Sequence, residues 1–325
     1  MTAVLVTGGA GYVGSHACKA LARAGFTPVA YDNLSRGRRR LARFGPLEVG
    51  DIRDRGRLDA ALRRHRVEAV MHFAAYAYVG ESVAAPALYY QNNLAGTLDL
   101  LEAMRARDIG LLVFSSTCAT YGVPARTPIT EDAEQRPINP YGMSKLAVER
   151  VLADFGAAYG LRSVALRYFN AAGADPDAEI GEDHDPEPHL VPRVLMAAAG
   201  TLPEVEVFGT DYPTPDGTCV RDYVHVSDLG EGHVQALEYL RGGGASVALN
   251  LGTGRGHSVR EVIAAAERVT GRRVPVRQAP RRPGDPPVLV ADPSRARALL
   301  GFAPRHAGIE DIVASAWRWH RGQHG

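Results

Sequence analysis

Lysine is almost absent from this chain of 325 residues. Only Lys19 and Lys145 are lysines, and all the others of its 37 basic residues are arginines. A lysine side chain is a compact point charge whose pKa shifts readily, a property that arginine does not share. Each of the two lysines therefore marks a position where a specific role of an ammonium group is expected.

Cysteine and long apolar runs are also scarce. Cys18, Cys118 and Cys219 are scattered and fit neither a disulfide framework nor a zinc-binding spacing, so no metal is predicted. No stretch approaches the ~18 consecutive apolar residues of a membrane helix, and residues 1–6 lack the basic region of a signal peptide. A formal net charge of +1 gives no indication of a nucleic-acid or membrane partner. These features predict a cytoplasmic globular protein.

The first half of the chain alternates short apolar runs with helical patterns. Strands are predicted at 3–7, 27–32, 47–49, 69–73, 111–115 and 163–168, and helices at 12–24, 54–64, 84–106 and 140–159. Near-continuously apolar strands separated by helices are typical of a parallel sheet covered on both faces. The predicted fold class is therefore α/β, with a doubly wound, Rossmann-like parallel sheet.

The second half contains many proline-rich connections, such as Asp185-Pro186-Glu187-Pro188. Helices are predicted at 190–199, 228–240, 258–270 and 308–321, and strands at 205–208, 247–251 and 274–278. We expect residues 1–170 to form the sheet domain and residues 171–325 a smaller mixed α/β substrate domain. Segments near 221–255 are expected to return to the first domain.

A glycine-rich turn, Thr7-Gly8-Gly9-Ala10-Gly11-Tyr12-Val13-Gly14, follows the first predicted strand and opens the first helix. Gly8 permits a tight turn, Gly11 lets the backbone approach a pyrophosphate, and Gly14 lets helix and strand pack closely. Asp32 ends the next strand, where a carboxylate accepts hydrogen bonds from an adenosine ribose and repels a 2′-phosphate. The pattern predicts NAD, in preference to NADP, as the cofactor.

Two features near Asp32 in the sequence each have two interpretations. Asp51 follows the third predicted strand and is either an adenine contact or an ordinary turn aspartate. The basic run Arg36-Gly37-Arg38-Arg39-Arg40 is most simply a solvated loop, and contact with a cofactor phosphate is the alternative.

Tyr141 and Lys145 are the predicted catalytic pair. They lie at positions i and i+4 of a helix that begins after Asn139-Pro140, so they share one helical face. A phenol is a poor base at neutral pH, but a nearby ammonium, together with the positive nicotinamide ring of the predicted cofactor, favours the phenolate and lowers its pKa. Tyr141 is therefore the expected proton acceptor. A hydroxyl within 115–117, at the carboxyl end of a strand, is expected to orient the substrate oxygen.

Taken together, these motifs resemble the extended short-chain dehydrogenase/reductase family, and within it the UDP-sugar 4-epimerases. The resemblance runs from Val4 to about Trp319. Besides the glycine turn, its specific pieces are Asp32-Asn33-Leu34, Gly50-Asp51-Ile52, His72-Phe73-Ala74-Ala75, Val79-Gly80-Glu81-Ser82, Tyr89-Tyr90-Gln91-Asn92-Asn93, Tyr141-Gly142-Met143-Ser144-Lys145, Leu166-Arg167-Tyr168-Phe169-Asn170, Asp211-Tyr212-Pro213-Thr214, Asp216-Gly217-Thr218, Val220-Arg221-Asp222-Tyr223 and Arg281-Arg282-Pro283-Gly284-Asp285.

The resemblance implies two domains: residues 1–170 bind NAD, and residues 171–325 bind the UDP-sugar. It implies that the catalytic residues are Tyr141, Lys145 and Thr117. The implied NAD contacts are Gly8, Gly11, Tyr12, Val13, Gly14, Asp32, Asn33, Asp51, Ile52, Phe73, Ala74, Ala75, Asn92, Ser115, Tyr141, Lys145 and Tyr168. The implied substrate contacts are Thr117, Tyr141, Phe169, Asn170, His189, Leu190, Val207, Phe208, Arg221, Tyr223, Arg282, Asp285 and Leu289.

The reaction implied is epimerisation at C4 of a UDP-sugar through a transient 4-keto intermediate. UDP-galactose/UDP-glucose is the first expectation, and a UDP-pentose (UDP-xylose/UDP-arabinose) or a UDP-uronic acid (UDP-glucuronate) is the alternative. Related dehydratases and decarboxylases carry a carboxylate within the segment that matches 117–121, and Thr117-Cys118-Ala119-Thr120-Tyr121 has none. A non-catalytic NAD-sensing scaffold predicts loss of Tyr141 or Lys145, and both are present. The family also implies a homodimer formed through 84–106 and 140–159.

Three positions depart from the family pattern. Ala77 stands where many members have a lysine near the cofactor, and His189 where some have an asparagine near the nucleotide. Thr117 replaces the commoner serine and keeps its hydroxyl. The position of Leu289 helps to set the room beside the sugar C2 substituent in the family, which implies some turnover of N-acetyl sugars here. The alternative is that Leu289 is only an apolar strand residue.

Overall fold

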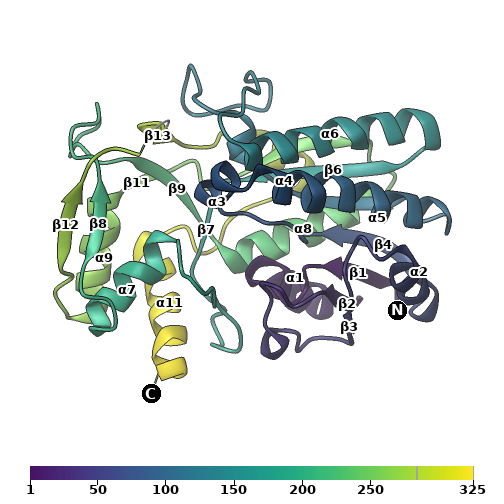
Figure 1. Ribbon diagram of the computed structural model, residues 1–325, viewed down its shortest axis with the longest axis horizontal. Coiled ribbons are helices and arrows are strands. Elements are labelled where there is room, and N and C mark those ends of the chain that lie inside the picture. Colours follow the sequence, from purple (N-terminus) through teal and green to yellow (C-terminus); the bar gives the residue numbers. More distant parts are fainter. Residues whose placement is uncertain (283–284, 325) are drawn as a thin grey trace.

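The computed structural model describes residues 1–282 and 285–324, and its centre is a seven-stranded parallel sheet with helices on both faces (Figure 1). The strand order is β10-β6-β5-β4-β1-β2-β3, and every neighbouring pair is parallel. The strands are β1 Ala3–Thr7, β2 Thr27–Asp32, β3 Leu47–Val49, β4 Val67–His72, β5 Leu111–Thr117, β6 Arg162–Tyr168 and β10 Val247–Leu251. The strand order reverses between β1 and β4, which in such sheets is where ligands bind at the carboxyl ends. The predicted fold class is confirmed.

One hydrophobic core lies on each face of this sheet. On one face, α1 (Tyr12–Arg23) and α8 (Val226–Arg241) bury Ala17, Leu21 and Leu237 against the strands. The other face is covered by α2 Arg55–Arg64, α5 Gly96–Arg105 and α6 Pro140–Tyr159. Because both faces are covered, the central strands are buried at nearly every position and their sequences are mostly apolar.

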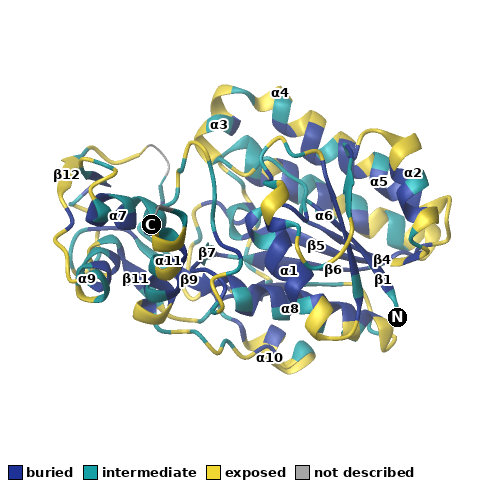
Figure 2. Cartoon of the chain, turned by 90° about the horizontal axis from the view of Figure 1, so that it is seen from below, coloured by how far each residue is buried: buried dark blue, intermediate teal, exposed yellow. Residues whose placement is uncertain are grey.

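A second, smaller layer lies beside the sheet (Figure 2). Its strands are β7 Asn170–Ala172, β8 Val205–Phe208, β9 Val220–His225, β11 Gly256–Ser258, β12 Val276–Ala279 and β13 Val288–Leu289, and its helices are α7 Leu190–Ala199, α9 Val259–Thr270 and α11 Ile309–His324. β9 pairs with β7, β11 and β13, while β8 pairs with β12. The capping box of Ser258 and Glu261 begins α9 as its sequence indicates.

The chain crosses between the two layers more than once. After β9, α8 packs against α1 and β10 joins the edge of the large sheet beside β6, and α10 (Ser294–Leu300) then packs near them. The assignment of residues 1–170 and 171–325 to separate domains stays a prediction. Among the described residues, no helix is long and apolar enough to cross a membrane.

The single helix predicted at 84–106 is wrong. The structure has four pieces there: α3 Val79–Ala84, α4 Pro86–Tyr89, a π-helical segment η2 Tyr90–Ala95, and α5. Pro86 begins α4, because it lacks the N–H group that a continuous helix would need at that position. The π-helical turn buries Asn92 and Asn93 toward the sheet, which a regular helix would place differently.

Candidate active site

The turn after β1 has no room for side chains at two of its glycines. Gly8 has a φ of +73°, and a Cβ on Gly14 would lie 2.1 Å from the carbonyl oxygen of Gly8. Helix α1 begins after Gly11 without a side-chain cap, so its first N–H groups are free to bind a ligand. A dinucleotide pyrophosphate fits such a turn and helix start, and these residues therefore fit NAD.

Asp32 ends β2 beside this turn. Its carboxylate accepts hydrogen bonds from the backbone N–H groups of Ala10 at 3.0 Å and Leu34 at 2.8 Å. Burial raises the pKa of this carboxyl above its usual value, although the two backbone hydrogen bonds oppose the shift. A Cβ on Gly37 would lie 2.7 Å from the Asp32 Oδ1 atom, so only glycine lets the 35–37 loop close over the carboxylate.

A cavity at the carboxyl ends of β1, β2 and β4 joins these features. Its lining includes eight residues expected from the sequence: Gly8, Asp32, Asn33, Ile52, Phe73, Ala74, Ala75 and Asn92. It also includes Arg36 and Gly37, from the run for which contact with the cofactor was the alternative, and Gly50, from the Gly50-Asp51-Ile52 motif. Three further lining residues, Tyr31, Ser35 and Tyr76, were not predicted, and the only signal for them was their position next to a motif residue. Asp51 is not among the lining residues, and its carboxylate binds Arg53 and, at 3.0 Å, the Asn33 side-chain amide.

The basic run at 36–40 is only in part the solvated loop that was expected, since Arg39 and Arg40 are exposed while Arg36 and Gly37 line the cavity. Arg36 forms an ion pair of 2.5 Å with Glu81, and its guanidinium lies 5.0 Å from the ring centroid of Tyr78. Arg38 and Arg40 both form ion pairs with Asp183, from the connection that follows β7. The run therefore joins the glycine turn to the second layer.

Three consecutive hydroxyls at the end of β5 have three different surroundings. The Ser115 Oγ lies 2.7 Å from the hydroxyl oxygen of Tyr168 on β6. The Ser116 Oγ donates to Glu149, a carboxylate that also pairs with Arg167. Thr117 is buried at the end of the strand, where its Oγ1 accepts from the N–H of Ala119. Of the three, Ser115 and Thr117 face the predicted site and Ser116 faces a separate ion pair.

Helix α6 positions the predicted catalytic pair. Asn139 caps the helix by accepting from the N–H of Gly142 at 2.8 Å, and Pro140 is its first residue. One turn further, the Lys145 Nζ donates to the carbonyl oxygen of Ser115 at 2.7 Å and lies 4.7 Å from the ring centroid of Phe114. Burial lowers the pKa of Lys145 to about 7.

The Tyr141 hydroxyl is buried beside Thr117. In the protein alone, burial raises its pKa well above the usual value, and a hydrogen bond with Thr117 opposes this shift. The lowering expected from Lys145 and the nicotinamide ring together stays a prediction, because it depends on the charge of the bound cofactor. The structure nevertheless brings together Tyr141, Thr117, Ser115, Lys145 and Tyr168, which were all predicted to lie at one site.

The second layer contributes the residues expected to hold the substrate. Arg221 on β9 forms an ion pair of 2.6 Å with Asp285, and its backbone is in register with Leu289 of β13. The Arg282 guanidinium lies 3.9 Å from the ring centroid of Phe208 on β8. Pro283 and Gly284 of the same motif lie outside the described residues.

An apolar cluster connects this substrate side to the catalytic side. Phe169 and Tyr121 are buried together, with Leu289 and Cys118 packed against them. Cys118 directly follows Thr117, so the cluster reaches from β13 to the end of β5. Of the other predicted substrate residues, Asn170 and Tyr223 pair in register across β7 and β9, Leu190 begins α7, and Val207 lies on β8.

Comparison with known proteins agrees with this arrangement. Residues 4–252 match the NAD dependent epimerase/dehydratase family. The chain belongs to this family. A curated relative, the UDP-glucose 4-epimerase of Rhizobium leguminosarum bv. trifolii, is 54% identical over 317 residues, covering 98% of this chain and 97% of the relative.

Two solved structures of the family superpose closely. UDP-glucose 4-epimerase from Brucella ovis in complex with NAD has a TM-score of 0.96 at 55% identity, with 98% of each chain covered. The enzyme from Stenotrophomonas maltophila, with bound NAD and formylated UDP-arabinopyranose, has a TM-score of 0.96 at 46% identity, covering 100% of this chain and 99% of that chain.

Two departures from the family pattern have a structural context. Ala77 is exposed, and the Arg36 guanidinium lies over the rings of its neighbours Tyr76 and Tyr78. A cation is therefore present at this edge of the cavity. His189 forms ion pairs with Glu182 and Glu187, and half of its side chain is buried.

Proposed function

We propose that this chain interconverts UDP-glucose and UDP-galactose by NAD-dependent epimerisation at C4 through a transient 4-keto sugar. The observation that carries the proposal is the convergence of Tyr141, Thr117 and Lys145 beside a turn that fits NAD. Its family and its close relatives support the same reaction. Bound NAD supplies a reversible hydride acceptor and the positive charge of its nicotinamide ring.

Tyr141 is proposed to move the proton. Its raised pKa keeps the phenol protonated in the protein alone, so the added positive charge of the bound cofactor is needed to favour the phenolate. The phenolate then takes the proton of the 4-hydroxyl and, once the 4-keto sugar has rotated and is reduced again on its opposite face, returns the proton to the same oxygen. Thr117, which shares a hydrogen bond with Tyr141, is proposed to hold the substrate oxygen in line.

The nucleotide end is proposed to bind in the second layer. Arginine pairs bidentately with phosphate, and Arg221 and Arg282 lie on the strands and the loop that surround the cluster of Phe169 and Leu289. Asp285 is proposed to accept from the uridine ribose. Fixing UDP in this way lets the keto sugar rotate about its bond to the diphosphate.

We also propose a cytoplasmic homodimer. The large apolar side chains of Tyr90, Leu98 and Met143 lie on η2, α5 and α6, the elements that cover the second face of the sheet, and 37–41% of each is exposed. Burying such side chains against a second copy is favourable. Sedimentation of the purified protein is the direct measurement, and a monomer at micromolar concentration would contradict this part.

The deciding experiment for the reaction is incubation of purified protein with UDP-galactose and no added nucleotide. Formation of UDP-glucose, followed by NMR, is the expected result, because one molecule of NAD is reduced and reoxidised in each turnover. Parallel incubations with UDP-xylose and UDP-glucuronate test the alternative substrates. Faster turnover of either would move the proposal to a pentose or a uronic acid.

A further inference from the structure

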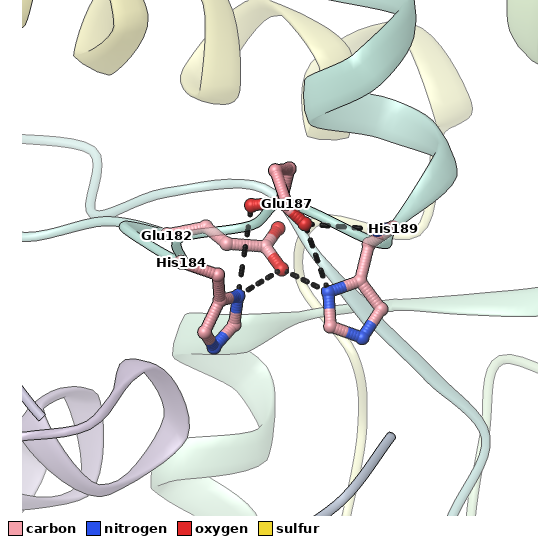
Figure 3. Close-up of side chains that lie close together, drawn as sticks. All are labelled: Glu182, His184, Glu187 and His189. Atoms are coloured by element: carbon pink, nitrogen blue, oxygen red, sulfur yellow. Dashed lines mark hydrogen bonds and ion pairs between the residues drawn. The ribbon is translucent and has the colours of Figure 1, made fainter. Parts of the chain in front are cut away.

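Four polar side chains converge in the connection between β7 and α7 (Figure 3). They are Glu182, His184, Glu187 and His189, and we call them the His–Glu cluster. One potential ligand atom from each side chain lies within 4.8 Å of the others. Both imidazoles direct their Nδ1 atoms toward the carboxylates (Figure 3).

The contacts within the His–Glu cluster are direct hydrogen-bonded ion pairs whose lengths lie close to the spacing of ligands around a small cation. The His184 Nδ1 lies 3.1 Å from a Glu182 oxygen and 3.6 Å from a Glu187 oxygen. The His189 Nδ1 lies 2.6 Å and 3.2 Å from oxygens of the same two residues. Ligands placed tetrahedrally around Zn²⁺ at its usual bond lengths are about 3.3 Å apart. Small shifts of the side chains therefore suffice to admit the ion.

Apart from the two imidazoles, no cationic side chain among the described residues forms an ion pair with the carboxylates of the cluster. The side chains of Glu182 and Glu187 are 7% and 9% exposed, and within residues 1–282 and 285–324 neither forms an ion pair with lysine or arginine. Carboxylates so far removed from water require compensation by positive charge. Here, only the two imidazoles provide it.

A second acidic group in the same connection shows the contrast. Asp175, Asp177 and Glu179 all bind the Lys19 Nζ, at 2.7, 2.8 and 2.6 Å. This ammonium fills the centre of that group, so no ion is needed there. In the His–Glu cluster the two carboxylates are compensated by imidazoles alone, which a metal ion can bind in place of their protons.

We propose that the His–Glu cluster binds Zn²⁺ through two imidazole nitrogens and two carboxylate oxygens. Zinc takes nitrogen and oxygen ligands in tetrahedral sites, and the set here supplies two of each. Calcium and magnesium prefer six or more oxygen ligands, which the cluster does not offer. The sequence signal is the spacing Glu-x-His-x-x-Glu-x-His at 182–189, which contains no cysteine.

Binding is an exchange of the ion for protons. The Nδ1 atoms of His184 and His189 lie at hydrogen-bond distance from carboxylate oxygens, so each carries a proton when no ion is bound. One Zn²⁺ enters and these two protons leave to the buffer, so the net charge of the cluster does not change.

The position of the cluster assigns the ion a structural role. The His184 ring lies 6.2 Å from that of Tyr12, the first residue of α1, and 5.8 Å from that of Tyr78. His189 directly precedes α7, and the Trp319 indole donates to the carbonyl oxygen of Glu182 at 2.9 Å. A bound ion would thus fix the start of α7 relative to the glycine turn.

The test uses the purified full chain without an affinity tag, stripped with a chelator and dialysed against micromolar Zn²⁺. Elemental analysis is expected to give one zinc per chain, and His184→Ala and Glu187→Gln are expected to lose it. His65→Ala is the matched control, because His65 lies 2.7 Å from Glu48 in a pair that has no further imidazole. Zinc should raise the thermal midpoint of the wild type and of His65→Ala, but not of the cluster variants.

A measurement on the wild type alone guards against misfolding of the variants. X-ray absorption of the zinc-loaded protein should show four nitrogen or oxygen neighbours, of which two are imidazoles. Co²⁺ in place of zinc should give the intense visible absorption of a tetrahedral site. Failure of the wild type to retain zinc, retention by both cluster variants, or a different imidazole count would each overturn the proposal.

Discussion

The Lys145 Nζ donates a hydrogen bond of 2.7 Å to the carbonyl oxygen of Ser115, from α6 to β5. This contact fixes the ammonium at the end of the strand that also carries Thr117. In the protein alone, burial dominates and raises the pKa of Tyr141. We expect the phenolate to form when the positive charge of the bound cofactor adds to that of Lys145.

The first prediction concerns the proton acceptor. Tyr141→Phe keeps the ring and removes only the hydroxyl, so we expect kcat to fall by about 10²–10⁴-fold, the usual contribution of a general base. NAD should still copurify. The measurement is UDP-galactose turnover together with the nucleotide content of the purified protein. Tyr159→Phe, at the exposed end of the same helix, is the control and should keep full activity.

The second prediction concerns the glycine turn. Gly14→Ala places a methyl group 2.1 Å from the carbonyl oxygen of Gly8, so the turn must open and bound NAD should be lost. Gly110→Ala is the matched control, because a Cβ there meets nothing within 4 Å. Nucleotide released on denaturation is measured for both variants. Equal NAD content in the two would show that the close packing of the turn does not matter for binding.

The sequence correctly predicted those parts of the site whose arrangement depends on the spacing of residues within one segment. The glycine turn and Asp32 each lie at the end of a strand, and Tyr141 and Lys145 lie one turn apart on α6, as their spacing indicates. The break at Ala85, before Pro86, has a local cause that the prediction of one helix over 84–106 overlooked. The π-helical segment does not: its Asn93 binds Tyr76 and Ser144, and no local pattern contains such distant contacts.

Contacts between distant segments were not predictable in the same way. Arg36 reaches Glu81, and Arg38 and Arg40 reach Asp183, so a basic run that is typical of a solvated loop becomes a set of ion pairs. Whether each arginine is solvated or forms an ion pair depends on which distant segment the fold places next to it. For the predicted NAD and substrate contacts, the structure supplies positions and neighbours, and their roles stay predictions.

The third prediction concerns the choice of cofactor. The buried Asp32 carboxylate, held by the N–H groups of Ala10 and Leu34, should repel a 2′-phosphate. We expect chromatography of the nucleotide released from purified protein to give NAD. Asp32→Asn should narrow the preference, because the charge is lost while the size is kept. Recovery of mainly NADP from the wild type would show that the arginines at 36–40 override Asp32.

The fourth prediction concerns stability in mild acid. Burial lowers the pKa of four histidines, His16 and His233 to about 4 and His72 and His225 to about 3. As the pH falls below 6.5, the unfolded chain takes up protons that the folded chain refuses, so stability is lost. Each site adds up to about 1.4 kcal/mol per pH unit to the slope.

Urea unfolding at pH 6.5, 6.0 and 5.5 measures this slope. His72→Gln should flatten it, since His72 is fully buried between Thr7 and Thr97. The raised pKa values of His184 and His189 oppose part of this slope near pH 6.5, where the unfolded histidines are about half protonated and the folded ones fully protonated. This opposing contribution is nearly gone by pH 5.5, so the slope should steepen as the pH falls. A free energy of unfolding that does not change with pH would contradict the prediction.

The last prediction concerns the sugar C2 substituent. Leu289 is half-buried on β13, in register with Arg221 and packed against the cluster that contains Phe169 and Cys118. This position lies between the proposed nucleotide site and Thr117, where the sugar is expected. Leucine leaves more room than tyrosine, so we expect efficient turnover of UDP-galactose and weaker turnover of UDP-N-acetylglucosamine. Leu289→Tyr should abolish the second activity and spare the first, because only the larger substituent meets the added ring.

Leu289→Met, which conserves volume, is the control and should change neither activity strongly. If the wild type lacks N-acetyl activity, or if Leu289→Tyr harms both substrates equally, Leu289 is an ordinary apolar strand residue and another side chain limits the pocket.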